Sequence, residues 1–169
     1  MTKGGKMAKV IMLCGKICSG KSTYARKLRD SLNAVILSND ELMIDILGKD
    51  TGDMHDEYVR RTEFYFSKKA AEIVKAGVDV ILDRGLWTKP RRDLTREQFR
   101  DAGVDCEIHY LNVPDDEWKR RIAKRNAEVE NGRSDVYFID DGLLEKFHSM
   151  FEIPDESEID VWVESEHNG

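Results

Sequence analysis

The residues Gly15–Ser22 (GKICSGKS) match the pattern G-x-x-x-x-G-K-[ST], whose residue types and spacing suit a loop that binds phosphate groups. The glycines Gly15 and Gly20 permit backbone angles that turn successive N–H groups toward one point, which makes a site for an anion. The Lys21 ammonium would reach the outer phosphates of a nucleotide, and the Ser22 hydroxyl is a ligand for Mg²⁺. The residues predicted to contact the nucleotide are Gly15, Lys16, Ile17, Cys18, Ser19, Gly20, Lys21, Ser22 and Thr23.

Two carboxylates follow apolar runs of the kind that form buried strands. Asp40 lies just after the run 34–37, and Asp83 ends the run 78–83. Ligands of open parallel sheets bind at the carboxyl ends of the strands, so both carboxylates are expected to face the phosphate loop. Asp40 is predicted to be a catalytic base that accepts a proton from an attacking hydroxyl, with helix capping as the alternative. Asp83 is predicted to hold Mg²⁺ with Ser22; the alternative is a turn residue that Arg84 neutralises.

A strongly basic segment lies at residues 118–125 (WKRRIAKR). On a helix, Trp118 and Ile122 share the buried face, while Arg121 and Arg125 are four residues apart and stack along another face. Two parallel guanidinium groups clamp phosphates and stabilise charge that moves during phosphoryl transfer. We therefore predict that Arg121 and Arg125 are catalytic, together with Lys21.

The pattern of apolar runs and periodic segments predicts the elements that position these residues. The predicted strands are 9–14, 34–37, 78–83, 104–111 and 159–163, and the predicted helices are one beginning near residue 20, a short one after residue 38, 55–76, 89–102, 114–130 and 142–151. Such alternation predicts an α/β fold with a mostly parallel five-stranded sheet and helices on both faces. With the phosphate loop after its first strand, the expected fold class is a P-loop NTPase three-layer sandwich. We expect one domain over 9–169, with a flexible leader over 1–8 and a lid near 118–135.

The 169 residues carry 33 acidic and 27 basic side chains, a net charge of −6, but the charge is unevenly distributed. Residues 147–169 contain seven acidic residues and no Lys or Arg, so the rest of the chain is nearly neutral. A near-neutral body suits a compact anion such as ATP better than a long nucleic acid. We expect the acidic segment to cover the basic lid, the arginines of 89–100 to pair within their own helix, and the Lys16 side chain to be solvated.

Several classes of protein are excluded or disfavoured. No apolar run is long enough to span a membrane, and the run after the basic start is too short for a signal peptide. Three cysteines, an odd number, fit a reducing compartment, so we expect a cytoplasmic chain. Its oligomeric state is open between a monomer and a homodimer. The four histidines lack metal-ligand spacing, and no N-K-x-D tetrad of a GTPase occurs.

Together the segments GKICSGKST, SNDE, LDRGLW with the following RR, and VPDDEWKRRIAKRN resemble the small P-loop kinase family. That family includes the kinase domain of phage polynucleotide kinase, zeta toxin and chloramphenicol phosphotransferase, and the resemblance runs from residue 9 to 151. It implies that Lys21 and Ser22 are the phosphate-binding pair and that Asp40 is the base. It also implies that Arg121 and Arg125 are lid arginines, and that Asp83 begins the acceptor-side loop.

One departure bears on the acceptor. Polynucleotide kinases carry an arginine three residues after the base, where this chain has Met43, so Arg91 or Arg92 would have to replace it. We therefore expect an ATP- and Mg²⁺-dependent kinase that transfers the γ-phosphoryl group to a hydroxyl of a small molecule. The alternatives are a 5′-hydroxyl polynucleotide kinase and a non-catalytic ATP-binding or ATPase module.

Overall fold

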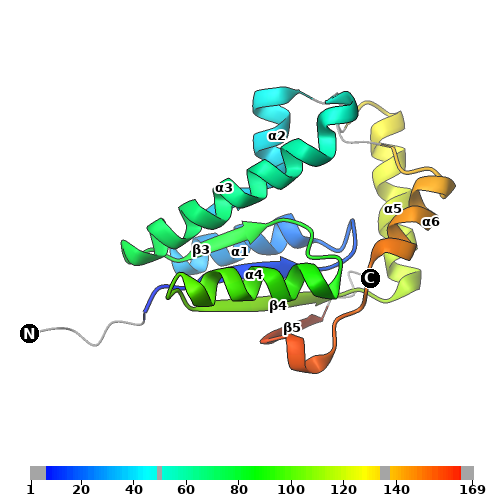
Figure 1. Ribbon diagram of the computed structural model, residues 1–169. Coiled ribbons are helices and arrows are strands. Elements are labelled where there is room, and N and C mark those ends of the chain that lie inside the picture. Colours follow the sequence, from blue (N-terminus) through cyan, green and yellow to red (C-terminus); the bar gives the residue numbers. More distant parts are fainter. Residues whose placement is uncertain (1–6, 49–50, 134–137, 165–169) are drawn as a thin grey trace, which may run out of the picture.

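The computed structural model describes residues 7–48, 51–133 and 138–164 (Figure 1). Its sheet has the strands β1 (Val10–Cys14), β2 (Val35–Ser38), β3 (Val80–Asp83), β4 (Cys106–Asn112) and β5 (Val161–Glu164). The strand order is β2-β3-β1-β4-β5 and every pair is parallel, which confirms the predicted α/β class. Most of the predicted leader and the last two residues of the predicted lid lie outside the described residues.

The helices of the described residues follow the predicted segments closely. They are α1 (Lys21–Leu32), α2 (Asn39–Leu47), α3 (His55–Lys75), α4 (Lys89–Asp101), α5 (Asp115–Glu130) and α6 (Asp141–Met150), with 3-10 turns at Gly52–Met54 and Glu156–Glu158. Ser38 caps α2, because its hydroxyl accepts a hydrogen bond from the Glu41 backbone N–H at 3.3 Å. No helix of the described residues is long and apolar enough to cross a membrane.

The central strand β1 is buried along its whole length because strands flank it on both sides and helices cover both faces. Side chains alternate along a strand, so Val10 and Met12 pack toward α3 and α4, while Ile11 and Leu13 pack toward α1. This packing fixes the carboxyl end of β1, from which the predicted phosphate loop emerges.

A separate apolar cluster joins α5 and α6 to the phosphate loop. Val113, Trp118, Ile122 and Ile139 are buried in it, and Ile17 of the loop packs against them. The Trp118 indole N–H also donates to the Ile17 carbonyl at 2.6 Å. In Figure 1, α5 and α6 stand beyond the carboxyl ends of the strands. The predicted lid is therefore anchored beside the loop.

Two acidic residues of the C-terminal segment pair with arginines of α4. Glu158 pairs with Arg92, and Asp160 pairs with Arg96 at 2.5 Å. The expected pairing within the helix is therefore wrong for Arg92 and Arg96, since their partners lie more than sixty residues further along the chain.

At the start of the acidic segment, Phe147 packs against the apolar cluster of Trp118 and His148 packs against its ring, and Glu164 lines the same cavity as Arg120 and Lys124. Coverage of residues 118–125 by the acidic segment therefore stays a prediction.

Candidate functional site

The loop between β1 and α1 has the backbone geometry of an anion nest. Cys18 and Gly20 adopt left-handed φ angles of 59° and 95°. A Cβ atom at Gly15 would lie 2.6 Å from the Ser19 hydroxyl and 3.2 Å from the Leu111 carbonyl, so a side chain there would displace the Ser19 hydroxyl and crowd the strand end. The Ser19 hydroxyl is buried and has no partner among the described residues. Such an unpartnered donor suits a ligand that carries oxygen acceptors.

Lys21 lies at the start of α1 and points back across the loop. Its ammonium donates to the carbonyls of Gly15 and Lys16 at 2.9 and 2.8 Å. Burial lowers the pKa of Lys21, whereas the nearby carboxylates of Asp83 and Asp40 raise it. The lysine is thus held close to both predicted acidic residues, within the space that a phosphate chain would enter.

Asp40 and Asp83 come together because their strands are neighbours. Asp83 is in register with Ser38 at the end of the β2–β3 pair, and Asp40 follows two residues later in the first turn of α2. Burial raises the pKa of Asp40, and the Asp83 carboxylate raises it further, while Lys21 and Arg125 lower it. The helix cap is Ser38, so the capping alternative for Asp40 is wrong.

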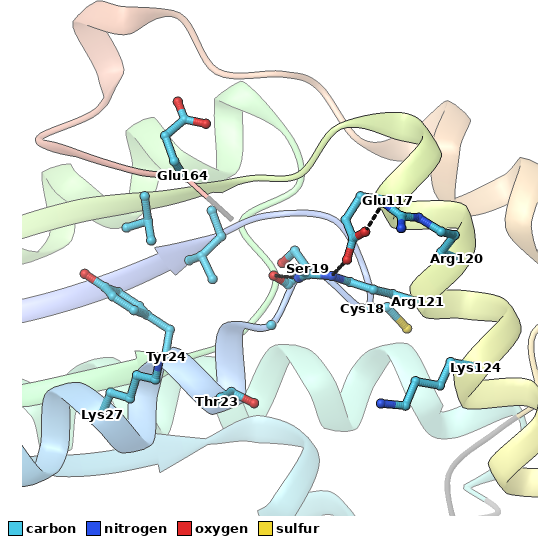
Figure 2. A pocket seen from close by; sticks show the side chains of 13 residues that line it. Cys18, Ser19, Thr23, Tyr24, Lys27, Glu117, Arg120, Arg121, Lys124 and Glu164 are labelled. Carbon is cyan, nitrogen blue, oxygen red and sulfur yellow. Dashed lines mark hydrogen bonds and ion pairs between the residues drawn. The ribbon is translucent and has the colours of Figure 1, made fainter. Parts of the chain in front are cut away.

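The two lid arginines both contact the phosphate loop. Arg121 donates to the Glu117 carboxylate at 2.7 Å and to the Ser19 carbonyl at 3.0 Å (Figure 2). Arg125 donates to the Cys18 thiol at 3.4 Å. Glu117 is itself buried, so it fixes the direction in which Arg121 points. The structure thus brings both guanidinium groups to the loop on the side that α5 covers.

The side chain of Lys16 was expected to be solvated, but it contacts α5. Its ammonium pairs with Asp115 at 2.6 Å and lies 4.8 Å from the centre of the Trp118 ring. These contacts tie the first half of the loop to the first turn of α5. The side chain therefore holds the loop and the lid together, which leaves its backbone to contact phosphate.

A cavity of about 720 Å³ opens beside the loop, within the size range of sites for small molecules (Figure 2). It lies between α1, α5 and the carboxyl ends of β4 and β5. Its lining residues are Cys18, Ser19, Gly20, Thr23, Tyr24, Lys27, Leu111, Glu117, Arg120, Arg121, Lys124, Val163 and Glu164. The cavity joins the phosphate loop to an apolar region further out.

Ser22 and Asp83 share the wall of a second cavity, of about 610 Å³, which also includes Ser38 and Glu41. Hydroxyl and carboxylate oxygens are the donors that Mg²⁺ prefers, and Mg²⁺ commonly takes only one or two of them besides phosphate and water. The described residues hold no cluster of three or more His, Cys, Asp or Glu side chains suited to a metal ion. The donor set fits a cation that arrives with a nucleotide.

Three arginines next to the acceptor-side loop differ in whether their guanidinium groups are available to an acceptor. Arg84 is buried and donates to the Glu63 carbonyl, the Ser67 hydroxyl and the Thr95 hydroxyl, and the described residues show no ion pair between it and Asp83. Arg92 is only 1% exposed and is occupied by an ion pair, so the expectation that it could serve the acceptor is wrong. Arg91 pairs with Glu63 and remains partly exposed.

Sequence reasoning missed two residues of this region. Glu117 clamps Arg121, and its spacing of four residues from that arginine was the available signal. Asn39 is buried, and both of its amide atoms lack a partner among the described residues. No sequence pattern indicates this, because an asparagine before a helix is ordinarily read as a cap.

Comparison with known proteins identifies the family. Residues 10–152 match the sequence profile of a family described as an AAA domain. The chain belongs to this family of P-loop kinase-like domains. Among curated proteins, no sequence matches it. Family membership and the phosphate loop together imply that this AAA domain binds a nucleotide.

Solved structures of small P-loop kinases have the same fold as this AAA domain. An APS kinase of Mycobacterium tuberculosis, in complex with AMPPNP and APS, superposes with a TM-score of 0.67 at 23% identity, over 96% of this chain and 91% of that chain. A gluconokinase of Sinorhizobium meliloti gives 0.61 at 15% identity, over 95% and 84%. A Pnkp1/Rnl/Hen1 RNA repair complex gives 0.66 at 20% identity, over 88% of this chain and 45% of that chain.

Proposed function

We propose that the chain is an ATP- and Mg²⁺-dependent kinase that transfers the γ-phosphoryl group to a hydroxyl of a small-molecule acceptor. The observation that supports the proposal is the strand register, which sets Asp83 beside Ser38, two residues before Asp40, at the sheet edge where the loop emerges. The contacts of the two lid arginines with this loop add to it. Catalysis of phosphoryl transfer depends mostly on positioning and on stabilising charge, and these residues supply both.

The loop and Lys21 have the role of binding the phosphate chain. Lys21 would exchange its two carbonyl partners for phosphate oxygens, a charge-assisted contact that is stronger than the bonds it leaves. Bound at Ser22 and Asp83, Mg²⁺ would supply further neutralisation of phosphate charge. Arg121 and Arg125 would stabilise the charge that builds up as the phosphoryl group moves.

Asp40 has the role of the base. Its carboxylate would accept the proton of the acceptor hydroxyl while the oxygen forms its bond to the γ-phosphorus and the bond to the β-γ bridging oxygen breaks, so that ADP leaves. A raised pKa suits this task, because a more basic carboxylate takes a proton more readily. The unpartnered amide of Asn39, the neighbouring residue, is a candidate contact for the acceptor.

A polynucleotide acceptor is the second candidate, and the observations favour it less. Met43 is buried where polynucleotide kinases have an arginine, and Arg92 is occupied by Glu158. A non-catalytic ATP-binding module would have no need for a base next to the loop or for paired lid arginines. The three cysteines are free thiols, which supports a cytoplasmic location, where we expect a monomer or a homodimer.

The test is a screen of labelled phosphate transfer from ATP to pooled metabolites, nucleosides, antibiotics and 5′-hydroxyl oligonucleotides. Lys21→Ala should abolish turnover, and Asp40→Asn should bind ATP normally but lose transfer. The matched control is Asp45→Asn on the exposed side of the same helix, which should behave as the wild type. Full transfer by Asp40→Asn would refute the assignment of the base.

Binding titrations run beside the screen separate the alternatives. Binding of an oligonucleotide that weakens steeply between low and high salt would favour the polynucleotide acceptor. ATP binding without transfer to any pool would favour a non-catalytic module.

A further inference from the structure

A buried guanidinium group without a carboxylate partner of its own lies on the acceptor side of the candidate site. Arg84 follows Asp83, the last residue of β3, and is 6% exposed. Its guanidinium donates only to neutral groups of α3 and α4, namely the Glu63 carbonyl and the Ser67 hydroxyl at 3.2 Å and the Thr95 hydroxyl at 3.3 Å. Its Nε atom is buried and has no partner in the part of the chain that the structure describes. Buried charges in proteins are ordinarily paired, so this charge leaves room for an anionic partner that the chain does not supply.

A second arginine lies close to this charge. Arg91, in the first turn of α4, pairs with the Glu63 carboxylate of α3, and the two side chains are 42% and 17% exposed. Burial lowers the pKa of Arg84 to about 10, while Glu63 raises it and Arg91 lowers it, so the three groups are near one another. Both helices cover the same face of the sheet (Figure 1). Two cations therefore share one carboxylate there, which leaves an excess of positive charge.

Asn39 faces the same layer of helices. It is 5% exposed, and neither its amide oxygen nor its amide nitrogen has a partner among the described residues. Asn39 and Met43 are four residues apart on α2 and therefore share a face of that helix. The Thr62 hydroxyl of α3 donates to the Met43 sulfur at 3.6 Å, so this face of α2 meets α3 one residue before Glu63.

The register of the sheet places these groups beside the proposed base. Ser38 of β2 is paired with Asp83 of β3. The next residues along the two strands, Asn39 and Arg84, therefore leave the sheet side by side, and Asp40 follows directly. A molecule whose hydroxyl lies at Asp40 would next meet the Asn39 amide and the excess positive charge.

We propose that the phosphoryl acceptor carries an anionic group, a carboxylate or a phosphate ester, and that Arg91 binds this group with Arg84 behind it and Asn39 beside it. The proposal rests on the proposed kinase function, with Asp40 as the base, and adds the class of acceptor. The Glu63 carboxylate holds Arg91 until oxygens of the acceptor take its place, which exchanges one charge-assisted contact for another. A guanidinium group presents parallel N–H donors that match a carboxylate and a phosphate equally, so both remain in the class.

The first test measures anion binding without turnover. The full chain is saturated with Mg²⁺ and AMPPNP, so that the phosphate loop is occupied, and inorganic phosphate or acetate is then titrated in. Nuclear magnetic resonance of the arginine Nε–H groups follows the binding, because the Nε of Arg84 has no partner before the anion arrives. At least one of the two anions should shift this signal in the wild type.

Two variants of the same ion pair should have opposite effects. Arg91→Gln should weaken anion binding by about tenfold or more, because hydrogen bonds to a charged group are lost. Glu63→Gln should strengthen it by about twofold to fivefold, because the competing carboxylate is gone. A merely structural pair would move both variants in the same direction. The control is Arg60→Gln, which breaks an exposed pair with Glu57 on α3 and should leave the dissociation constant unchanged.

The second test compares carboxylated, phosphorylated and neutral hydroxyl compounds as acceptors of labelled phosphate from ATP. Transfer should occur to one of the two anionic pools, and that pool identifies the anionic group. For that acceptor, Arg91→Gln should raise KM by about tenfold or more and leave the KM of ATP unchanged, because the residue binds the acceptor alone. Neither test alters Arg84, whose bonds to α3 and α4 belong to the packed interior.

Four results would overturn the proposal: no binding of either anion, an unchanged anion affinity in Arg91→Gln, weaker binding in Glu63→Gln, or transfer to neutral compounds alone. A wild type that does not bind AMPPNP, or transfers phosphate to no pool, would refute the proposed function itself. In that case the opposite effects of the two variants still decide whether the anion site exists.

Discussion

The ion pair between Arg92 and Glu158 offers a quantitative test of what anchors the acidic C-terminal segment. The side chains are 1% and 7% exposed. Arg92 Nε donates to Glu158 at 2.8 Å, and its Nη1 donates to the carbonyls of Leu86 and Glu152 at 3.2 and 3.0 Å. Removing one partner of such a pair leaves a buried charge without compensation.

The expected cost follows from these contacts. Breaking a buried ion pair costs about 3–5 kcal/mol. In Arg92→Met, the Glu158 carboxylate keeps the Asp155 backbone N–H at 3.0 Å and the Lys89 ammonium at 3.8 Å. We therefore expect the free energy of unfolding to fall by about 3 kcal/mol, the lower end of that range. The double variant Arg92→Met/Glu158→Leu buries no charge and should cost no more than either single variant.

The assay is unfolding in urea at neutral pH, followed by far-ultraviolet circular dichroism. Arg100→Met is the matched control on the same helix, because Arg100 and Glu97 form an exposed pair at 3.1 Å whose loss should cost less than about 1 kcal/mol. A loss below about 1 kcal/mol for Arg92→Met, or additive losses in the double variant, would refute the reasoning.

The difference in unfolding free energy between the wild type and Arg92→Met should also depend on pH, in a direction that the pKa of Glu158 sets. The hydrogen bond from Arg92 lowers the pKa of Glu158 below 4.5 in the folded state. The stabilisation from the Arg92–Glu158 pair is therefore fully present above pH 4.5, the ordinary pKa of a glutamate. It is lost as the pH falls through the lowered pKa of Glu158 in the folded state. The gap in unfolding free energy between wild type and Arg92→Met should narrow on acidification below that point.

Three further predictions concern the candidate site. A plot of kcat/KM against pH should be bell-shaped, because the pKa of Asp40 is raised above 3.8 and that of Lys21 is lowered below 10.5. A value of kcat/KM that does not fall at either acidic or alkaline pH would contradict this. Gly15→Ala should weaken ATP binding by about tenfold, since its Cβ would displace the Ser19 hydroxyl and crowd the Leu111 carbonyl. Gly142→Ala on α6 should not weaken it, and titration calorimetry would measure both. Arg125→Gln should lower kcat about 10²-fold with little change in ATP affinity; steady-state kinetics that show the reverse would assign this arginine to ground-state binding.

The sequence was sufficient for the order of the elements and for the residues at the ends of strands. Buried runs and turn residues are local signals, and the rule that ligands lie at the carboxyl ends of parallel strands links Asp40 and Asp83 to the loop. The partners of long side chains were not predictable in this way. Lys16 reaches Asp115, and Arg92 reaches Glu158, across distances in sequence that no periodicity encodes.

The same limit applies to the buried polar groups. His109 looks in the sequence like an isolated histidine on a strand, and only the packing of α1 onto β4 brings Tyr24 to it. The two unpartnered amide atoms of Asn39 depend on burial by neighbouring elements, which local propensity does not report.

The contact between the C-terminal segment and α4 has a consequence for the order in which the chain folds. Thr88, at the N-terminus of α4, provides no side-chain cap, and the Lys89 backbone N–H donates instead to the Glu152 carboxylate at 2.7 Å. The cap is therefore supplied from 63 residues later in the chain. Closing a loop of that length costs entropy before any contact repays it. We expect the first turn of α4 and the loop after β3 to gain their protection from hydrogen exchange late in folding.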